Sequence, residues 1–451
     1  MTESALPTSF LCQSLVEKFS ARQAIVGIIG LGYVGLPLAL TAARAGYRVI
    51  GFDIDAARVE GLNRGHSDIR HIADAEIAEQ ITSGHFRATT LGDALSEADV
   101  IVICVPTPLT RHREPDLSFV TNTAREIARV LHVGQLVVLE STTYPGTTTE
   151  VVKPLLEAGG LRSGRDFFLA FSPEREDPGN PDFSTAAIPK VLGGDGADAL
   201  VAADAFYSRI VVRTVSVSSP ATAEAVKLTE NIFRSVNIAL VNELKVIYAA
   251  MGIDVWEVIE AAKTKPFGFM PFYPGPGLGG HCIPIDPFYL TWKAREFDIS
   301  TRFIELAGQI NTRMPYAVVD RLAEALDRTL GRGLNGARIL VLGLAYKKNV
   351  DDMRESPSLK LIELLELRGA HADFHDPFIP VVPPTREHPE LQGRRSAPLD
   401  PTMLGLFDAV LIATDHDDID YAVVAARAKL VVDTRNACAR RGLAGPHIVK
   451  A

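Results

Sequence analysis

The sequence predicts an α/β fold made of two Rossmann-like, doubly wound domains, which are joined by a helical middle domain with one long central helix. Three observations support this prediction. Short apolar segments of strand type alternate with helical segments before residue 215. One helical pattern then runs without a break from 220 to 251, and the alternation of strands and helices resumes beyond residue 335.

The first alternating region contains five apolar runs typical of buried strands. They occupy residues 24–30, 47–53, 98–108, 135–145 and 166–174. Because helices separate these runs, we expect a parallel sheet with both faces covered. The expected domains are an N-terminal extension at 1–23, a dinucleotide-binding domain at 24–215, a helical middle domain at 216–330 and a second Rossmann-like domain at 331–451.

The helical segment at 220–251 is longer than the usual helix of a globular protein and is closed by Gly252. Such a helix is expected to pack against a partner subunit, giving a homodimer or a higher homo-oligomer. In the last region, Ser356 and Pro357 predict the start of a helix, and Gly369 predicts its end.

The composition excludes several classes of protein. The 451 residues carry a net charge of −9, which argues against a nucleic-acid partner. No run of about 18 uncharged apolar residues is present, and the first residues lack the pattern of a secretory signal, so a cytoplasmic protein without a membrane span is expected. The four cysteines are widely scattered, which predicts free thiols and neither a disulfide framework nor a metal site.

A dinucleotide site is predicted at the first strand. Gly30, Gly32 and Gly35 have the GxGxxG spacing between an apolar strand and a helix, and Asp53 ends the second strand. The glycines allow a tight turn, a close approach of the pyrophosphate and contact between helix and strand. A carboxylate at the position of Asp53 accepts hydrogen bonds from ribose hydroxyls and repels a 2′-phosphate, which favours NAD over NADP; the nearby Arg58 weakens that preference.

Three polar residues of the long helix, Lys227, Asn231 and Arg234, are spaced so that they share one face. One interpretation is a solvated stripe, since a long helix needs a wet side. The other is an ammonium and an amide that stabilise a developing oxyanion in a cleft.

Cys282 also has two interpretations. Free cysteine is among the most buried residue types, so a structural thiol is one of them. However, Cys282 follows four glycines and His281, and backbone amides with a nearby lysine would lower the pKa of a thiol and favour a nucleophile. Asp286 could cap a helix that begins at Pro287, serve as a base that orients water, or do both.

At this point the motifs identify a resemblance. The segments "GLGYVGLPLA", "VPTPLT", "ESTTYPGTT", "FSPERE", "KLTENIFRSVNIALVNE", "GPGLGGHCIPIDP" and "YKKNVDDMRESP" resemble those of the UDP-glucose/GDP-mannose dehydrogenase family, over essentially the whole chain after residue 23. Members of this family oxidise the C6 alcohol of a nucleotide sugar to a carboxylate and reduce two NAD. The resemblance implies a UDP-sugar substrate, bound by the domain at 331–451, and a role in polysaccharide biosynthesis.

The resemblance implies a role for each matching residue. Cys282 would be the nucleophile that forms a thiohemiacetal and then a thioester; Lys227 and Asn231 would hold the oxyanion; Asp286, Thr142 and Lys227 would position water; and Glu174 would be the acid/base. The cofactor would contact Gly30, Gly32, Tyr33, Val34, Gly35, Asp53, Arg58, Pro106, Thr107, Thr142 and Arg354. The substrate would contact Glu174, Arg175, Lys227, Asn231, Arg234, Tyr273, Gly277, Gly279 and Lys347.

"SPEREDPGN" and "VPTPLT" look most like the branch that acts on UDP-N-acetylhexosamines, because Arg175 stands where UDP-glucose enzymes more often have phenylalanine. The expected substrate is UDP-N-acetylglucosamine, followed by UDP-N-acetylmannosamine and then UDP-glucose. Two other functions remain open from the sequence. One is a single-step dehydrogenase of the β-hydroxyacid type, and the other is a non-catalytic NAD-sensing module with an acidic surface that recruits a protein.

Overall fold

The computed structural model of the chain describes residues 8–69, 72–110, 114–175, 185–280, 283–385 and 388–451. The chain forms two compact units, which are described separately. The first unit contains residues 1–230 and 292–299, and the second contains residues 231–291 and 300–451. None of the described helices is long and apolar enough to cross a bilayer.

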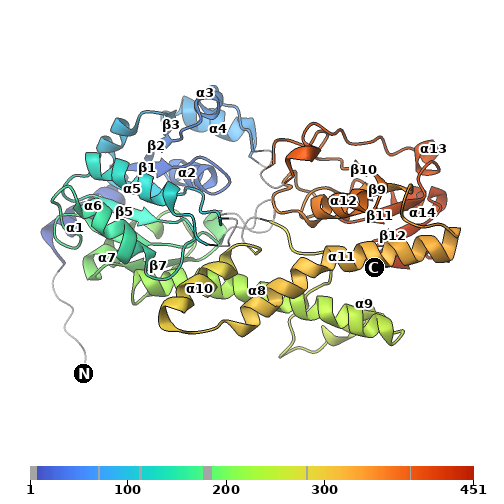
Figure 1. Cartoon of the computed structure of the whole chain (residues 1–451). Helices are drawn as coiled ribbons and strands as arrows, with labels where there is room; N and C mark the ends of the chain where they lie inside the picture. Colours follow the sequence, from blue (N-terminus) through green and yellow to red (C-terminus); the bar gives the residue numbers. More distant parts are fainter. Residues whose placement is uncertain (1–7, 70–71, 111–113, 176–184, 281–282, 386–387) are drawn as a thin grey trace. The chain divides into compact units, whose positions relative to one another are not determined.

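The first unit is built on a sheet of eight strands in the order β3-β2-β1-β4-β5-β6-β7-β8 (Figure 1). These strands are β1 (Ile25–Ile29), β2 (Arg48–Phe52), β3 (Phe86–Thr89), β4 (Val100–Ile103), β5 (Leu136–Leu139), β6 (Phe168–Phe171), β7 (Lys190–Gly194) and β8 (Thr214–Val217). All five predicted strands of this region are present. Neighbouring strands are parallel except β6 and β7, which are antiparallel.

Helices cover both faces of this sheet. They are α1 (Phe10–Ala21), α2 (Gly35–Arg44), α3 (Ala56–Asn63), α4 (Asp74–Thr82), α5 (Ser118–Val130), α6 (Lys153–Glu157), α7 (Ala197–Tyr207) and the start of α8 (Pro220–Ala250). Side chains of alternate residues enter separate cores: Val100 and Val102 of β4 lie in one, and Ile101 and Ile103 lie in the other. This explains why the strands are apolar throughout.

The antiparallel direction of β7 is a difference from the predicted sheet. The chain leaves β6 at the carboxyl edge of the sheet and starts β7 at that same edge, with Ala170 opposite Gly194 and Phe171 opposite Gly193. Without a crossover helix that returns the chain to the other edge, the next strand must run in the opposite direction. Lys190, the first residue of β7, therefore lies at the carboxyl edge.

The second unit contains a parallel sheet of five strands in the order β10-β9-β11-β12-β13. They are β9 (Arg338–Leu342), β10 (His371–His375), β11 (Ala409–Ile412), β12 (Val431–Asp433) and β13 (Ile448–Lys450). Its helices are the rest of α8, α9 (Val255–Ala262), α11 (Arg302–Leu330), α12 (Pro357–Leu367), α13 (Pro401–Leu404) and α14 (Tyr421–Arg427), while α10 (Asp286–Ala294) has residues in both units.

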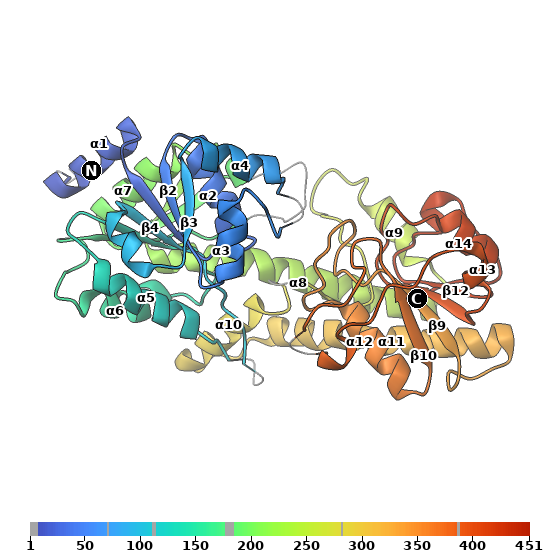
Figure 2. The ribbon, with the colours of Figure 1, turned by 90° about the horizontal axis from the view of Figure 1, so that it is seen from above.

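The long helix α8 is confirmed, and it ends just before Gly252, whose φ is +72°. The helix α12 begins with Ser356 as N-cap and Pro357 in its first turn, as predicted. A second long helix, α11, was not predicted; it contains Pro315 and runs alongside α12 (Figure 2). Proline inside a helix removes a backbone hydrogen bond, so the sequence pattern around Pro315 did not indicate a continuous helix.

The first residues of the described chain belong to the core of the first unit. The α1 side chains Cys12, Leu15 and Phe19 are buried, and the ring of Phe19 lies 5.5 Å from that of Phe206 on α7. No motif in the sequence predicted this role.

We expect Phe19→Ala to lower the free energy of unfolding by about 3–5 kcal/mol, because it leaves a cavity among aromatic side chains. Phe10→Ala is the matched control on the same helix, since Phe10 is 82% exposed, and we expect it to change stability by less than about 0.5 kcal/mol. Calorimetry measures both variants. Equal effects would show that α1 does not pack as the structure has it.

Candidate active site

The predicted cofactor and catalytic residues of the first unit follow the carboxyl ends of its parallel strands. The glycine loop follows β1, Asp53 follows β2, Thr107 follows β4, Thr142 follows β5 and Glu174 follows β6. In an open α/β sheet, this edge is where ligands bind. The sheet therefore brings these residues to one edge from positions far apart in the sequence.

The glycine loop has the geometry that a pyrophosphate requires. Gly30 has a φ of +90°, and a Cβ on Gly35 would lie 1.8 Å from the carbonyl oxygen of Gly30. Both positions therefore need glycine for the chain's own packing. A Cβ on Gly32 would have no atom of the described residues within 4 Å, so there the absence of a side chain leaves room beside the backbone. The loop, with Tyr33 and Val34 leading into α2, fits a dinucleotide.

Asp53 is 7% exposed and is held by two backbone amides. Its carboxylate accepts hydrogen bonds from the N–H groups of Leu31, at 2.8 Å, and Asp55, at 2.9 Å. Arg58 lies 3.6 Å from Asp53 but makes its hydrogen bonds to Asp68, at 2.7 and 2.8 Å. The Arg58 guanidinium is thus already paired with carboxylates and is not available to bind the 2′-phosphate of NADP. The position of the ribose therefore favours NAD.

The loops after β4 and β5 are tied to each other and to α8. The hydroxyl of Ser141, next to the half-buried Thr142, donates to the carbonyl of Val105 at 2.7 Å, just before Pro106 and Thr107. The fully buried Glu224 of α8 accepts hydrogen bonds from the N–H groups of Gly146, at 2.6 Å, and Thr148, at 2.9 Å. Burial raises the pKa of Glu224, and these hydrogen bonds oppose the rise.

The structure brings Glu174 and Lys227 together. The Lys227 ammonium donates to the backbone carbonyl of Glu174 at 2.5 Å, and both residues are buried. Burial alone would raise the pKa of the Glu174 carboxyl, but the ammonium groups of Lys190 and Lys227 lower it overall. Glu174 is therefore ionised at neutral pH, as a base must be.

Arg175 is held by α8 and by the chain before β7. Its guanidinium donates to Glu230 at 2.6 and 3.3 Å and to the carbonyl of Pro189 at 2.9 Å. These contacts fix the direction of the segment that carries Glu174.

In the second unit, Asn231 and Asp286 are paired. The amide of Asn231 donates to the Asp286 carboxylate at 2.5 Å, and both side chains are buried. Arg234, on the same predicted helix face, is exposed. Asp286 is the first residue of α10, so it lies at a helix start as its capping interpretation requires.

The glycine run before Cys282 packs closely against the segment after β9. A Cβ on Gly279 would lie 2.7 Å from Cβ of Tyr346, and the N–H of Gly280 donates to the carbonyl of Arg354 at 3.1 Å. Gly277 has a φ of +147°. Close backbone approach therefore explains these glycines, and it brings the run next to Lys347.

Two buried asparagines anchor the start of the glycine run. The N–H of Gly275 donates to Asn242 of α8 at 3.0 Å, Asn242 donates to Asn311 of α11 at 3.0 Å, and Asn311 donates to the carbonyl of Ser235 at 3.1 Å. Nearby, Tyr273 donates to Glu260 and stacks on Trp256. The nucleophile assigned from the sequence, Cys282, lies outside the described residues, as does His281.

The other three cysteines are unsuited to nucleophilic chemistry. Burial raises the pKa of Cys12 to about 11 and that of Cys438 to about 12. Burial, together with the nearby Glu140, also raises the pKa of Cys104. A thiol is reactive as the thiolate, so these three are inert at neutral pH.

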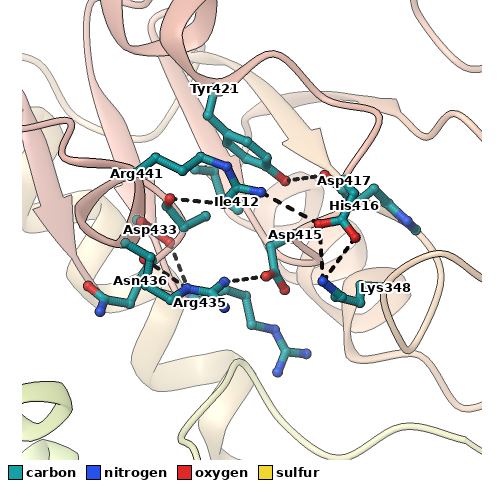
Figure 3. A network of polar contacts seen from close by, with 12 residues as sticks. Lys348, Ile412, Asp415, His416, Asp417, Tyr421, Asp433, Arg435, Asn436 and Arg441 are labelled. Atoms are coloured by element: carbon teal, nitrogen blue, oxygen red, sulfur yellow. Dashed lines mark hydrogen bonds and ion pairs between the residues drawn. The ribbon is translucent and has the colours of Figure 1, made fainter. Parts of the chain in front are cut away.

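Loops at the carboxyl edge of the second sheet form a polar network (Figure 3). Lys348 donates to Asp417 at 3.0 Å, and the N–H of Arg435 donates to Asp433 at 2.9 Å.

Lys245 of α8 has a buried ammonium without a hydrogen-bond partner among the described residues; burial and the nearby Arg435 lower its pKa to about 8. The segment after β9 also contains Lys347 and Arg354, whose guanidinium is paired with Asp352.

Sequence reasoning missed several polar residues of these sites, among them Glu140, Lys190, Glu224, Lys245 and Arg435. Their partners are distant in the sequence, so no local spacing marks them. Glu140 is the first residue of "ESTTYPGTT", and its position two residues before Thr142 was the one available signal. The described residues contain no group of three or more His, Cys, Asp or Glu side chains that could hold a metal ion.

Three segments of the chain match the domains of one family. Residues 24–211 match its NAD binding domain, residues 221–313 its central domain, and residues 340–440 its UDP binding domain. The chain belongs to the UDP-glucose/GDP-mannose dehydrogenase family. It is therefore a nucleotide-sugar dehydrogenase that uses NAD, which sets aside both the β-hydroxyacid dehydrogenase and the non-catalytic module.

Relatives match over nearly the whole chain. UDP-N-acetyl-D-mannosamine dehydrogenase of Pyrococcus horikoshii is 36% identical over 420 residues, covering 91% of this chain and 95% of the relative. UDP-N-acetyl-D-glucosamine 6-dehydrogenase of Pseudomonas aeruginosa is 36% identical over 396 residues, covering 87% and 90%.

Solved structures agree. UDP-D-ManNAc dehydrogenase from P. horikoshii superposes with a TM-score of 0.84 at 34% identity, over 94% of this chain and 98% of the other. Cap5O of Staphylococcus aureus, a UDP-N-acetyl-mannosamine dehydrogenase, has a TM-score of 0.77 at 29% identity, over 95% and 98%. These matches confirm the α/β architecture predicted from the sequence.

The glycine loop gives a test that separates packing from cofactor binding. We expect Gly32→Ala to leave the melting temperature within about 2 °C and to weaken NAD binding at least about tenfold, because the methyl group enters the space beside the loop. Gly35→Ala should lower both stability and binding, since its methyl group meets backbone. Calorimetry and NAD titration measure the two quantities; unchanged NAD binding in Gly32→Ala would contradict the assignment.

Proposed function

We propose that this enzyme oxidises the C6 alcohol of UDP-N-acetylglucosamine to a carboxylate, giving UDP-N-acetylglucosaminuronate with the consumption of two NAD. The observation that supports it most is the pairing of Lys227 with Glu174 at the carboxyl edge of the cofactor-binding sheet, in a chain that contains all three domains of the family. An ammonium group and an ionised carboxylate at this edge can act on an alcohol beside the cofactor.

Held by the glycine loop and Asp53, NAD would supply the hydride acceptor for each of two successive oxidations. Residues of the chain transfer the protons and bind the carbonyl carbon between the two oxidations. In our proposal Lys227 and Asn231 stabilise the oxygen of the substrate as it becomes negative. The trigonal carbon of an aldehyde does not readily release its hydrogen as hydride. A nucleophile must therefore first add to this carbon and make it tetrahedral.

We assign that nucleophile to Cys282. Its thiol adds to the aldehyde carbon as the sulfur–carbon bond forms and the thiol proton passes to the aldehyde oxygen. Loss of the C–H hydrogen as hydride, which the second NAD would accept, and of the hydroxyl proton then leaves a thioester. Water adds to the thioester carbon and the carbon–sulfur bond breaks, which releases the carboxylate and restores the thiol. Glu174 would take the proton of that water, while Asp286 and Thr142 orient it. The inert state of Cys12, Cys104 and Cys438 supports the choice of Cys282.

The sugar is assigned from one side chain and its surroundings. Arg175 follows Glu174 and is fixed by Glu230 and Pro189, so a cationic residue stands beside the catalytic carboxylate. UDP-N-acetylmannosamine is the second candidate, because a relative named for that substrate is equally similar at 36% identity. UDP-glucose is the third.

Further contacts follow from the positions of cationic and glycine residues in the second unit. We propose that Lys347, in the segment against which the glycine run packs, approaches the diphosphate or the sugar, and that Gly277, Gly279 and Tyr273 border the same ligand. Arg354 is assigned to the cofactor and Arg234 to the sugar or its new carboxylate.

We further propose that two copies of the chain associate through α8. Phe233, Leu240 and Ile247 are exposed and recur every seven residues, so they form an apolar stripe along the helix. We expect the protein to elute as a homodimer or larger in size-exclusion chromatography with light scattering, and the double variant Leu240→Glu/Ile247→Glu to shift toward the monomer. A wild-type monomer at micromolar concentration would contradict this.

The stoichiometry of NADH tests the proposed reaction. With excess NAD, we expect two NADH for each UDP-N-acetylglucosamine consumed, and a loss of at least about a thousandfold in kcat for Cys282→Ser. Cys438→Ser is the matched control, since that thiol is buried and its pKa is raised to about 12. UDP-N-acetylmannosamine and UDP-glucose are measured in parallel; a higher kcat/KM for either would reassign the sugar, and one NADH with released aldehyde would refute the four-electron reaction.

A further inference from the structure

Strand β7 carries a buried lysine to the acid/base carboxylate. In the antiparallel register of β6 and β7, Phe171 lies opposite Gly193. Continuing that register past the end of β6 places Lys190 opposite Glu174. The structure has this contact, because Nζ of Lys190 lies 2.5 Å from Oε2 of Glu174.

Lys190 has a second carboxylate partner. Its Nζ lies 2.8 Å from Oε2 of Glu140, the residue that follows β5, and the hydroxyl of Tyr207 on α7 donates to the other oxygen of Glu140. Relative exposures of 2% for Lys190, 1% for Glu140 and 7% for Glu174 show that water has little access to the cluster.

A buried cluster of this kind is costly to build. Each charged group loses hydration, and replacement of a buried ion pair by apolar residues is often neutral or stabilising. Packing alone therefore gives little reason for a lysine and a second glutamate behind the sheet edge. Glu174 is the one member that also meets Lys227, so the cluster connects directly to the proposed reaction.

We propose that Lys190 and Glu140 are positioning residues of the active site: the Lys190 ammonium, anchored by Glu140 and Tyr207, holds the Glu174 carboxylate in its orientation and in its ionised form. This inference rests on the proposed role of Glu174 as the acid/base. One carboxylate oxygen of Glu174 is occupied by Lys190, and the other accepts the N–H of Arg175 at 2.7 Å. The carboxyl group is thus fixed in its plane from both sides.

The charges around the cluster support this arrangement. Facing Glu174 are the ammonium groups of Lys190 and Lys227 and the carboxyl group of Glu140; their combined effect, against the effect of burial, is to lower the pKa of Glu174. Facing Glu140 are Lys190, Glu174, Tyr207 and Cys104, and burial raises the pKa of Glu140 to about 7. Below that pH Glu140 is protonated. The Lys190 ammonium then faces an ionised carboxylate at Glu174 and a neutral carboxyl group at Glu140.

The test is the pH dependence of kcat. Glu174 acts as a base only when ionised, so activity falls as the pH drops through its pKa. Lys190→Met should raise the pKa of Glu174 and move this acidic limb upward by about one to three pH units. Glu140→Gln should leave this limb in place, because Glu140 is already protonated in the pH range where Glu174 titrates. Lys190→Arg keeps the charge and should restore the wild-type limb to within about half a unit.

A limb that moves in Lys190→Met and returns in Lys190→Arg distinguishes tuning of Glu174 from general damage, which would lower kcat without moving the limb. The matched control is Lys153→Met, which removes a lysine paired with Asp195 at 2.8 Å in the same unit, and its limb should stay in place. If Lys190→Met does not fold, Lys190→Gln replaces it as the neutral variant, beside Lys190→Arg. An unmoved limb in the folded neutral variant would overturn the inference.

A second readout separates this inference from the proposed reaction. Infrared difference spectra between the protein and its Glu174→Gln variant report the protonated Glu174 carboxyl band across pH without any substrate. The band should titrate at higher pH in Lys190→Met and at the wild-type pH in Lys190→Arg. If this shift occurs without NADH formation from any tested sugar, the positioning holds and the proposed function fails. An identical titration in all variants would overturn the positioning itself.

Discussion

The antiparallel direction of β7 is the constraint on which the arrangement of the first unit depends. It places Lys190 at the carboxyl edge of the sheet, between Glu140 after β5 and Glu174 after β6. A parallel strand would start at the opposite edge and leave two buried carboxylates facing each other without a counter-charge, which is strongly unfavourable. Strand direction and active-site charge are therefore coupled, and the coupling explains why a doubly wound sheet departs from parallel order at this strand.

Helix α8 supplies the second organising element, because its side chains hold successive loops in place. In the first unit Glu224 binds the loop that carries Thr142, and Lys227 binds the backbone of Glu174. In the second unit Asn231 binds Asp286, and Asn242 binds the start of the glycine run. In each unit, the part of α8 that belongs to it therefore has a role beyond burial of apolar surface.

The features that could be predicted from the sequence are those with a local cause. The spacing of Gly30, Gly32 and Gly35 indicates the tight turn of the backbone, and the five strands that are apolar throughout could be recognised. Three strands of the first unit were missed: β3 and β8, which alternate apolar with polar residues, and β7, which begins with a lysine and ends with two glycines. The direction of β7 is set by pairing with a distant strand, so neither it nor the contacts of Lys190, 16 and 50 residues from its partners, has a local signal. The family resemblance supplied roles for Cys282 and Glu174 that spacing alone left open.

The central claim is that oxidation proceeds through a thioester on Cys282, and trapping that species tests it most directly. In a Glu174→Gln variant the activation of water is impaired, so the acylated enzyme should accumulate after mixing with NAD and UDP-N-acetylglucosamine. Mass spectrometry of the quenched, digested protein should then find the oxidised sugar nucleotide on the peptide that contains Cys282, and on no other cysteine peptide. An unmodified Cys282 peptide, recovered while aldehyde is released into solution, would contradict the account.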